Sequence, residues 1–363
     1  MLIRGLNLRG DTTDAGMPDT IEGFRRIIWR RCLFIISMAL IASAIAVYSL
    51  SIGSYEIGFI EVWRILIDHV TGNIQNGLYD HMVWNLRLPR ILLGILVGVG
   101  LAAVGATMQS ILKNPLADPY TTGISSGASF GATLAIILGL SLVGGDFAVI
   151  VNAFVFSLVP VSVILLVSRI KHASPTTMIL SGIAVMYIFG SLTTLFQLRA
   201  DPDDLKRVYN WGVGSLGYAD WDMLPICAAF TFAGMAVMML MASRLNVLSS
   251  GDDSAKSLGV DADRFRIIGL IIASLTTAGL VSFTGPIGFI GLVSPHVARI
   301  FIGSDNRFLI PASAAFGAAM TLAADMLGRI VVAPAILQVG VVMSFIGGPM
   351  FLYILIRQKR EVW

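Results

Sequence analysis

The chain has 363 residues, of which 56% are hydrophobic and 13% are charged, and its formal net charge is +3. A soluble domain carries about 25% charged residues, so this composition excludes an ordinary globular domain and is typical of a protein with many membrane spans. The small net charge gives no indication of nucleic-acid binding, and two isolated cysteines, Cys32 and Cys227, predict neither a disulfide framework nor a metal site.

Apolar runs of about 20 residues, the length that crosses a bilayer, recur along the chain. We predict spans at roughly 32–52, 91–112, 121–140, 147–168, 176–198, 222–243, 265–284, 286–302, 309–328 and 335–356. The stretch 265–302 is broken only around Gly285-Pro286 and Gly288, so it is either a hairpin or one kinked helix. The sequence therefore predicts an all-α polytopic membrane protein of about ten transmembrane helices. A polar tail at 1–31 precedes a single transmembrane domain at 32–358.

The distribution of basic residues predicts the orientation of the spans. With ten spans, 18 of the 25 Lys and Arg residues fall on one side and 7 on the other. Because cytoplasmic loops carry an excess of Lys and Arg, the richer side is the cytoplasm. We therefore expect a multi-pass protein of the cell membrane with both termini in the cytoplasm.

Two long segments are expected on the outer side. In the segment 53–90, apolar residues recur at helical spacing from Gly58 to Ile67, with charged residues between them, which predicts an interfacial amphipathic helix. The segment 199–221 holds Trp211, Tyr218 and Trp221, as expected of an aromatic belt at a membrane surface.

The segment from Arg244 to Arg266 is the most polar of the cytoplasmic connections, with eight charged residues among 23. Ser250 is a candidate N-cap of a short helix, Gly259 a candidate stop, and Asp261 a candidate cap of the next helix. The pattern predicts two short helices folded against each other. They form either an ordinary solvated loop or a docking site for a cytoplasmic partner.

Two further cytoplasmic connections break the helical pattern with proline. In Lys113-Asn114-Pro115-Leu116-Ala117-Asp118-Pro119, two prolines stop the helix, and a second break follows at Lys171-His172-Ala173-Ser174-Pro175-Thr176-Thr177. From the pattern alone, both are tight turns between helices.

A set of motifs gives the chain a resemblance to a known family. The first half carries Arg87-Leu88-Pro89-Arg90, Asn114-Pro115-Leu116-Ala117-Asp118-Pro119 and Gly123-Ile124-Ser125-Ser126-Gly127-Ala128. The second half carries Ser257-Leu258-Gly259-Val260, Gly285-Pro286-Ile287-Gly288-Phe289-Ile290-Gly291-Leu292-Val293-Ser294-Pro295-His296, Gly303-Ser304-Asp305, Ala324-Asp325 ahead of Arg329, Val339-Gly340-Val341 and Gly347-Gly348-Pro349. Over roughly residues 32–358 the chain resembles the FecCD permeases, the membrane subunits of type II ABC importers for ferric siderophores, haem and vitamin B12. Ser294 stands where that family often has Pro or Val.

The resemblance implies a bundle like that of the vitamin B12 permease and a set of partners. These are a second permease copy forming a homodimer, two ABC ATPase subunits, a periplasmic or extracellular solute-binding protein, and the lipid bilayer. It implies ATPase-coupling helices at about 249–262, with the coupling residues Ser250, Asp252, Asp253, Lys256, Ser257, Leu258, Gly259 and Val260. It implies cytoplasmic gate residues at Asn114, Leu116, Ser174 and Thr176, although Pro175 stands where some relatives have a small polar residue.

Three arginines on the outer side run against the charge bias. Arg87, Arg90 and Arg329 either extend to lipid headgroups, with Arg329 pairing locally with Asp325, or receive acidic residues of the binding protein. Arg suits the second role because its planar guanidinium binds a carboxylate bidentately. The resemblance favours these residues as the docking site.

Catalysis by the chain itself is not expected. The four histidines are dispersed, there is no Gly-Lys dipeptide from which a phosphate-binding loop could be built, and no nucleophile cluster stands out. We predict no enzyme activity, no cofactor and no metal site. A ferric siderophore is the first expectation for the cargo, with cobalamin, haem and molybdate left open. A secondary transporter without a motor, or an intramembrane enzyme, is the alternative class.

Overall fold

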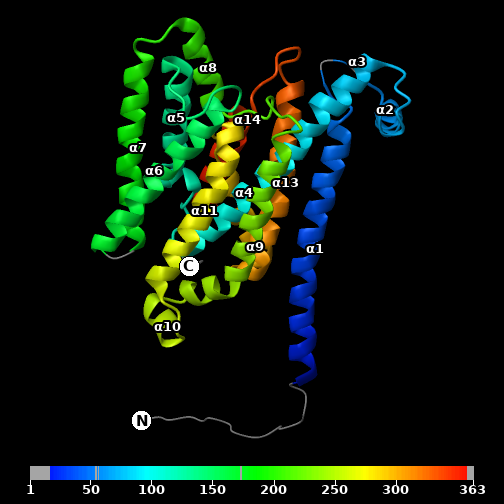
Figure 1. The fold of residues 1–363 in the computed structure, drawn as a ribbon. Coiled ribbons are helices and arrows are strands. Elements are labelled where there is room, and N and C mark those ends of the chain that lie inside the picture. The colour runs from blue at the N-terminus through cyan, green and yellow to red at the C-terminus, as the bar shows by residue number, and fades with distance from the viewer. Residues whose placement is uncertain (1–16, 54, 56, 172–173, 358–363) are drawn as a thin grey trace, which may run out of the picture.

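The computed structural model describes residues 17–53, 55, 57–171 and 174–357, and these residues form helices joined by loops, without a strand among them (Figure 1). The apolar helices are α1 (Met17–Ser49), α4 (Leu88–Ile111), α5 (Ile124–Leu138), α6 (Ala148–Lys171), α7 (Pro175–Gln197), α9 (Leu224–Ser249), α11 (Ala262–Thr284), α12 (Ile290–Ile302), α13 (Asn306–Ile330) and α14 (Val339–Arg357). The connections hold α2 (Phe59–Thr71), α3 (Gly77–Asp80), the π-helix η1 (His81–Arg87), the 3-10 helix η2 (Pro119–Thr122), α8 (Pro202–Gly212) and α10 (Asp252–Ser257). Each predicted span thus coincides with one apolar helix.

Seven of the apolar helices are long enough to cross a membrane, and α5, α12 and α14 are shorter. The 13 residues of α12 rise about 20 Å, which is less than the roughly 30 Å of a hydrocarbon core. Its start is buried within the bundle, where Ile290 is fully buried and Gly291 lies against Gly105 of α4. The stretch 265–302 is therefore not one kinked helix. It is two helices separated by the loop 285–289, the second of which starts inside the bundle.

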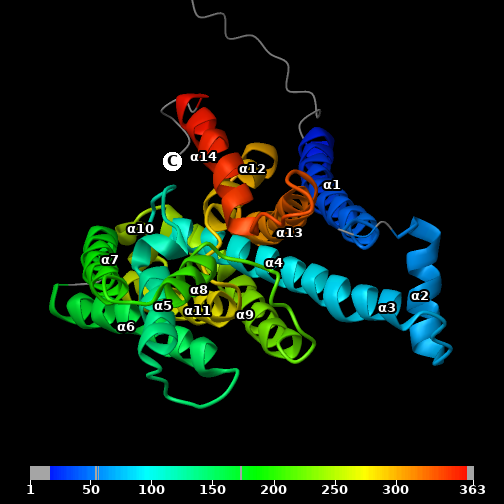
Figure 2. The same ribbon diagram turned by 90° about the horizontal axis from the view of Figure 1, so that it is seen from above.

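Helix α4 is the centre of the bundle, and most of its residues are buried. Figure 2 shows α6 and α7 on one side of it and α1 on the other. Glycines let its backbone touch two neighbours: a Cβ added at Gly98 would lie 2.6 Å from the carbonyl oxygen of Gly317 on α13, and one at Gly105 would lie 1.9 Å from that of Gly291 on α12. Such contacts between small residues are how membrane helices approach closely.

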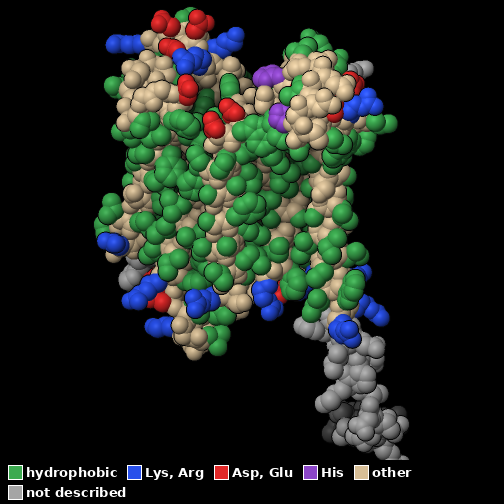
Figure 3. Space-filling view, turned by 45° about the vertical axis from the view of Figure 1, so that its right-hand side comes forward, with side chains coloured by type: hydrophobic (Ala, Val, Ile, Leu, Met, Phe, Trp, Pro, Cys, Tyr) green, Lys and Arg blue, Asp and Glu red, His purple; other side chains and the backbone are tan. Residues whose placement is uncertain are grey.

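The two ends of the bundle differ. Helices α2, α3 and α8 lie at one end, called here the α2 end, and α10 lies at the other, the α10 end (Figure 1). A broad hydrophobic band separates the charged side chains of the two ends (Figure 3). The predicted amphipathic helix is α2, whose Val62 is buried while Ile60 and Ile67 are exposed.

The structure adds detail to two predicted segments. Within the tail predicted at 1–31, α1 already begins at Met17, and residues 1–16 lie outside the described residues. The segment 249–262 contains one short helix, α10, rather than two, because the helix that Asp261 caps is already the start of the long α11.

Candidate functional site

Helix α10 is a single short helix exposed at its end of the bundle. Gly251 stands at its N-cap with φ +116°, Asp252 and Asp253 occupy its first turn, and Gly259 follows it with φ +77°. Acidic residues in a first turn are favoured by the helix dipole, and a positive φ is accessible to glycine at little cost. The Gly259 stop is thus confirmed, whereas Ser250 is not the N-cap: its Oγ donates to the carbonyl of Asn246 at the end of α9.

The predicted coupling residues lie together around this helix. Those exposed are Ser250, Asp252, Asp253, Lys256, Ser257, Leu258 and Gly259, while Val260 is half-buried. Leu258 is 68% exposed, an apolar side chain at the tip of an otherwise polar segment. After it, Asp261 caps α11 by accepting the backbone N–H of Arg264 at 3.1 Å, as predicted. The segment thus forms a compact and largely exposed surface.

The predicted gate residues of the first turn follow directly after α4. The Oδ1 of Asn114 accepts the backbone N–H of Leu116 at 2.9 Å, and the Leu116 side chain is exposed. Asp118 then caps η2 by accepting the N–H of Tyr120, and burial raises its pKa to about 6 against the lowering effect of that bond. The loop 113–118, called here the gate loop, is therefore held in a tight turn.

The second predicted gate turn starts α7. The Oγ of Ser174 accepts the N–H of Thr177 at 3.2 Å, and Pro175 takes the first helical position, where its missing N–H costs nothing. Thr176 is exposed beside it. The two turns are connected through η2, because a Cβ at Gly182 of α7 would lie 2.8 Å from the Cα of Thr122.

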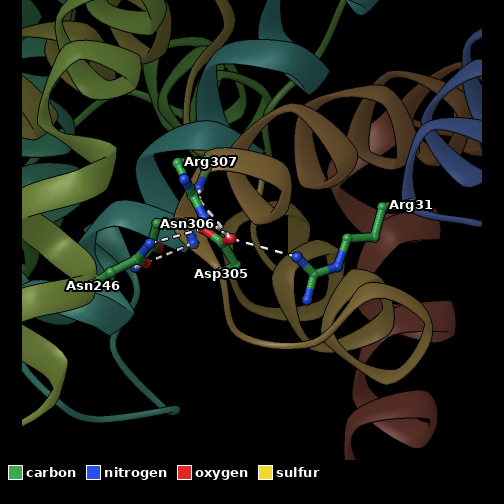
Figure 4. A network of polar contacts seen from close by, with 5 residues as sticks. All are labelled: Arg31, Asn246, Asp305, Asn306 and Arg307. Atoms are coloured by element: carbon green, nitrogen blue, oxygen red, sulfur yellow. Dashed lines mark hydrogen bonds and ion pairs between the residues drawn. The ribbon is translucent and has the colours of Figure 1, made fainter. Parts of the chain in front are cut away.

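An ionic cluster at the α10 end was not predicted as a site (Figure 4). Asp305 caps α13, pairs with Arg307 at 2.7 Å and Arg31 at 3.4 Å, and accepts the side-chain amide of Asn246 at 2.7 Å. The hydrogen bond from Arg307 is the main reason that the pKa of Asp305 is lowered to about 2. The cluster ties α1 and α9 to the start of α13. Its only sequence signal was the Gly303-Ser304-Asp305 motif.

A second unpredicted group surrounds Asp252. Lys113 of the gate loop and Arg266 of α11 both donate to its Oδ1, Lys113 at 2.6 Å. The Arg266 side chain is only 2% exposed and also donates to the carbonyl of Ile111, the last residue of α4. These contacts join α10 to the gate loop.

The three arginines predicted to dock a partner lie at the α2 end and point inward. Arg87 donates to the carbonyls of Leu50 and Tyr55, both at 2.7 Å, and Arg329 donates to those of Ser49 and Ile52. The carbonyls of Ser49 and Leu50 lie at the end of α1, where cations are favoured, and those of Ile52 and Tyr55 lie in the loop that follows. Arg87 and Arg329 are buried, whereas the Arg90 side chain is 12% exposed.

Asp325 lies between two of these arginines. It pairs with Arg90 at 2.8 Å and with Arg329 at 3.2 Å, so the predicted Asp325–Arg329 pair is present and Arg90 joins it. The carboxylate is buried, and the cations on both sides offset the cost of its burial.

A cavity of about 490 Å³ opens between the end of α8, the loop 285–289 and the start of α14. Its lining is uncharged and consists of Gly212, Val213, Pro286, Gly288, Gly340, Val341, Ser344 and Phe345. No group of three or more His, Cys, Asp or Glu side chains that could hold a metal ion occurs in the described part of the chain.

The whole chain can now be compared with known proteins. The model of the FecCD transport family matches residues 39–357, which is nearly all of the helical bundle. The chain belongs to the FecCD family. It is therefore an ABC importer permease, a multi-pass membrane protein of a kind whose ATPase is a separate subunit.

Relatives in the FecCD family carry different cargoes. The chain is 35% identical to the hemin transport permease HmuU of Yersinia pestis, over 79% of this chain and 86% of the relative, and 37% identical to the cobalamin import permease BtuC of Halobacterium salinarum, over 83% and 80%. A solved inward-facing metal-chelate type ABC transporter shares the fold with a TM-score of 0.78 and 27% identity, covering 89% of this chain and 99% of that one.

Proposed function

We propose that this chain imports an iron–siderophore-type chelate, which a solute-binding protein delivers at the α2 end and two ATPase subunits drive from the α10 end. The observation that carries the motor-driven part is α10 itself, a short helix followed by an exposed leucine. Its flanks are α9, which Asn246 fixes to α13, and α11, whose Arg266 binds Asp252 of α10. A solvated loop without a partner has no need of such fixed flanks. In this proposal the residues around α10 contact the ATPase.

The orientation follows from the same assignment. The α10 end carries the N-terminal side of α1 and most of the basic side chains, so it is placed in the cytoplasm with both termini. A second copy of the chain completes the assembly as a homodimer, and Asn114, Leu116, Ser174 and Thr176 line its cytoplasmic gate. The gate assignment is supported by the exposed positions of Leu116 and Thr176 at adjoining turns.

A complexed rather than a bare metal ion is the cargo that fits the described residues best. A bare iron ion would need carboxylate, imidazole or thiolate ligands on its way, whereas the cavity beside α14 has an uncharged lining. An organic shell around the metal removes that need. Cobalamin, haem and molybdate remain alternative cargoes, and the hemin and cobalamin relatives support the first two of these as readily as a siderophore.

A secondary transporter is less well supported. Such a protein needs an acidic residue in a span that gains and loses a proton or ion during transport. Asp325, the candidate for this role, is held between Arg90 and Arg329, so its charge is already compensated.

The docking of the binding protein at Arg87, Arg90 and Arg329 is also our proposal. Because Arg87 and Arg329 bind carbonyl groups within the chain, Arg90 is the residue through which an incoming carboxylate most readily makes contact. Its present partner, Asp325, would then share the guanidinium with the acid of the binding protein.

The cargo is tested with the reconstituted permease–ATPase complex and its binding protein. ATP hydrolysis is measured with ferric siderophores, cobalamin, haem and molybdate, each at saturating concentration, and with the iron-free siderophore as the matched control. A siderophore complex is expected to raise hydrolysis above the iron-free level, while the others do not. If only cobalamin, haem or molybdate stimulates ATP hydrolysis, that compound is the cargo and the siderophore proposal is wrong.

A further inference from the structure

The short helix α10 and the gate loop are joined by a direct ionic contact. The Nζ of Lys113 donates to Oδ1 of Asp252 at 2.6 Å, although the two residues are 139 positions apart in the sequence. Lys113 has φ +45°, an uncommon conformation for a residue with a Cβ, and it directly precedes Asn114, whose side chain closes the turn. The same residue thus sets the start of the gate loop and holds α10.

A buried guanidinium makes this contact part of a larger network. Arg266 donates to the same Asp252 oxygen, to Asp263, and to the carbonyl of Ile111 where α4 ends. Burial alone would raise the pKa of Asp252, but the hydrogen bonds from Arg266 and Lys113 outweigh that effect, so its pKa is lowered. The carboxylate therefore stays ionised at neutral pH, and both hydrogen bonds to it are charge-assisted.

The Asp305 cluster, at the same end of the bundle, holds the end of α9, the helix that precedes α10. Asn246, three residues before the end of α9, binds Asp305 and the backbone N–H of Asn306. The end of α9 is thus fixed to α13, whereas Asp252 joins α10 to the gate loop through Lys113 and to the start of α11 through Arg266. A displacement of α10 relative to the bundle is therefore passed on to the turn that holds Asn114 and Leu116.

We propose that Asp252, held by Lys113 and Arg266, is the positioning residue that transmits movement of α10 to the cytoplasmic gate loop. The proposal rests on the proposed function, because it takes α10 as the ATPase contact and the gate loop as the gate. The ion pair does not touch cargo or nucleotide. It acts by keeping two segments in register during the transport cycle.

The test measures cargo uptake per ATP hydrolysed in proteoliposomes that contain the whole complex. Lys113→Met removes the charge and keeps the length of the side chain, and uptake per ATP is expected to fall about two- to fivefold, the range for a half-exposed ion pair. Lys113→Arg should restore it. Arg264→Met is the matched control, because it removes the exposed Arg264–Asp261 pair of the same segment without touching the gate loop, and it should leave the ratio at the wild-type value.

A double-mutant cycle separates transmission from folding. Asp252→Asn removes the charge that both Lys113 and Arg266 bind, so it should lower the ratio at least as much as Lys113→Met. The double variant should be no worse than Asp252→Asn alone, because Lys113 then has no ion pair left to lose. A wild-type ratio in Lys113→Met, or additive losses in the double variant, would overturn the proposal. If both single variants lose ATPase binding to the same extent as they lose uptake, the ion pair acts in folding rather than in transmission, and the proposal is overturned. Absence of ATP-driven uptake in the wild-type complex would refute the proposed function, a different outcome from the first two.

Discussion

The carboxylate of Asp325 on α13 lies 2.9 Å from Nε of Arg90 on α4, and on its other side it pairs with Arg329, one turn further along α13. The group connects the centre of the bundle to the end of α1, because Arg329 also binds the carbonyls of Ser49 and Ile52. The α2 end of the bundle is therefore fixed by charged groups within a largely apolar protein.

Asp325→Asn should destabilise the bundle strongly. It leaves the guanidinium groups of Arg90 and Arg329 without a counter-charge, and removal of one partner of a buried ion pair costs about 3–5 kcal/mol. The thermal unfolding temperature of the purified protein in detergent is the measurement. Arg90→Lys, which keeps the charge but loses the planar fork, should lower this temperature less. An unchanged unfolding temperature in Asp325→Asn would show that the pair does not hold the helices together.

Removing both members of the pair tests the docking role of Arg90. Asp325→Asn leaves both Arg90 and Arg329 without a counter-charge, whereas Arg90→Ala with Asp325→Ala leaves only Arg329 without one, so the double variant should fold better than Asp325→Asn. If Arg90 receives an acid of the binding protein, this double variant should bind that protein with a slower association rate and a weaker salt dependence, measured by surface plasmon resonance. If the double variant associates with the binding protein at the wild-type rate at all salt concentrations, Arg90 does not dock that protein and acts only within the bundle.

Gly259 should be intolerant of any side chain, although the space around it is empty. A Cβ there meets nothing within 4 Å, but φ is +77°, and the left-handed conformation costs an L-residue about 1–2 kcal/mol. Gly259→Ala should therefore shift α10 and lower the ATP hydrolysis stimulated by cargo. Gly190→Ala is the matched control, because Gly190 also faces open space but lies within α7 without a positive φ. Equal hydrolysis in both variants would argue against a precise position for α10.

The proposed orientation is tested by labelling single cysteines in intact cells. Ser254 and Lys206 are both exposed, at the α10 end and the α2 end respectively. With Cys32 and Cys227 replaced, an impermeant thiol reagent added outside should label Lys206→Cys and not Ser254→Cys. Ser215 lies in the same outer segment as Lys206 but is buried, so a cysteine at that position is less suitable for labelling. Labelling of Ser254→Cys from outside would show that the α10 end lies outside the cell and that the proposed orientation is wrong.

Much of the fold could be predicted because its signals are local. Long apolar runs predicted each apolar helix that the structure describes. The stop at Gly259 and the cap at Asp261 were also predictable, because they depend on neighbouring residues only. Contacts between distant residues were not predictable, since one sequence carries no spacing signal for Lys113 with Asp252, or for Arg31 with Asp305, 274 positions apart. The inward direction of Arg87 was missed for the same reason: its partners are carbonyl groups, which every residue has.

The central claim is that cargo crosses this permease only when an ATPase acts on α10. Cargo uptake is therefore measured in proteoliposomes that hold the permease–ATPase complex, with ATP or a non-hydrolysable analogue inside, and with Leu258→Asp to place a charge on the exposed tip of α10. We predict uptake with ATP, none with the analogue, and a strong loss of both uptake and ATPase association in Leu258→Asp. Uptake by the permease alone, driven by an ion gradient and unchanged by Leu258→Asp, would contradict this account.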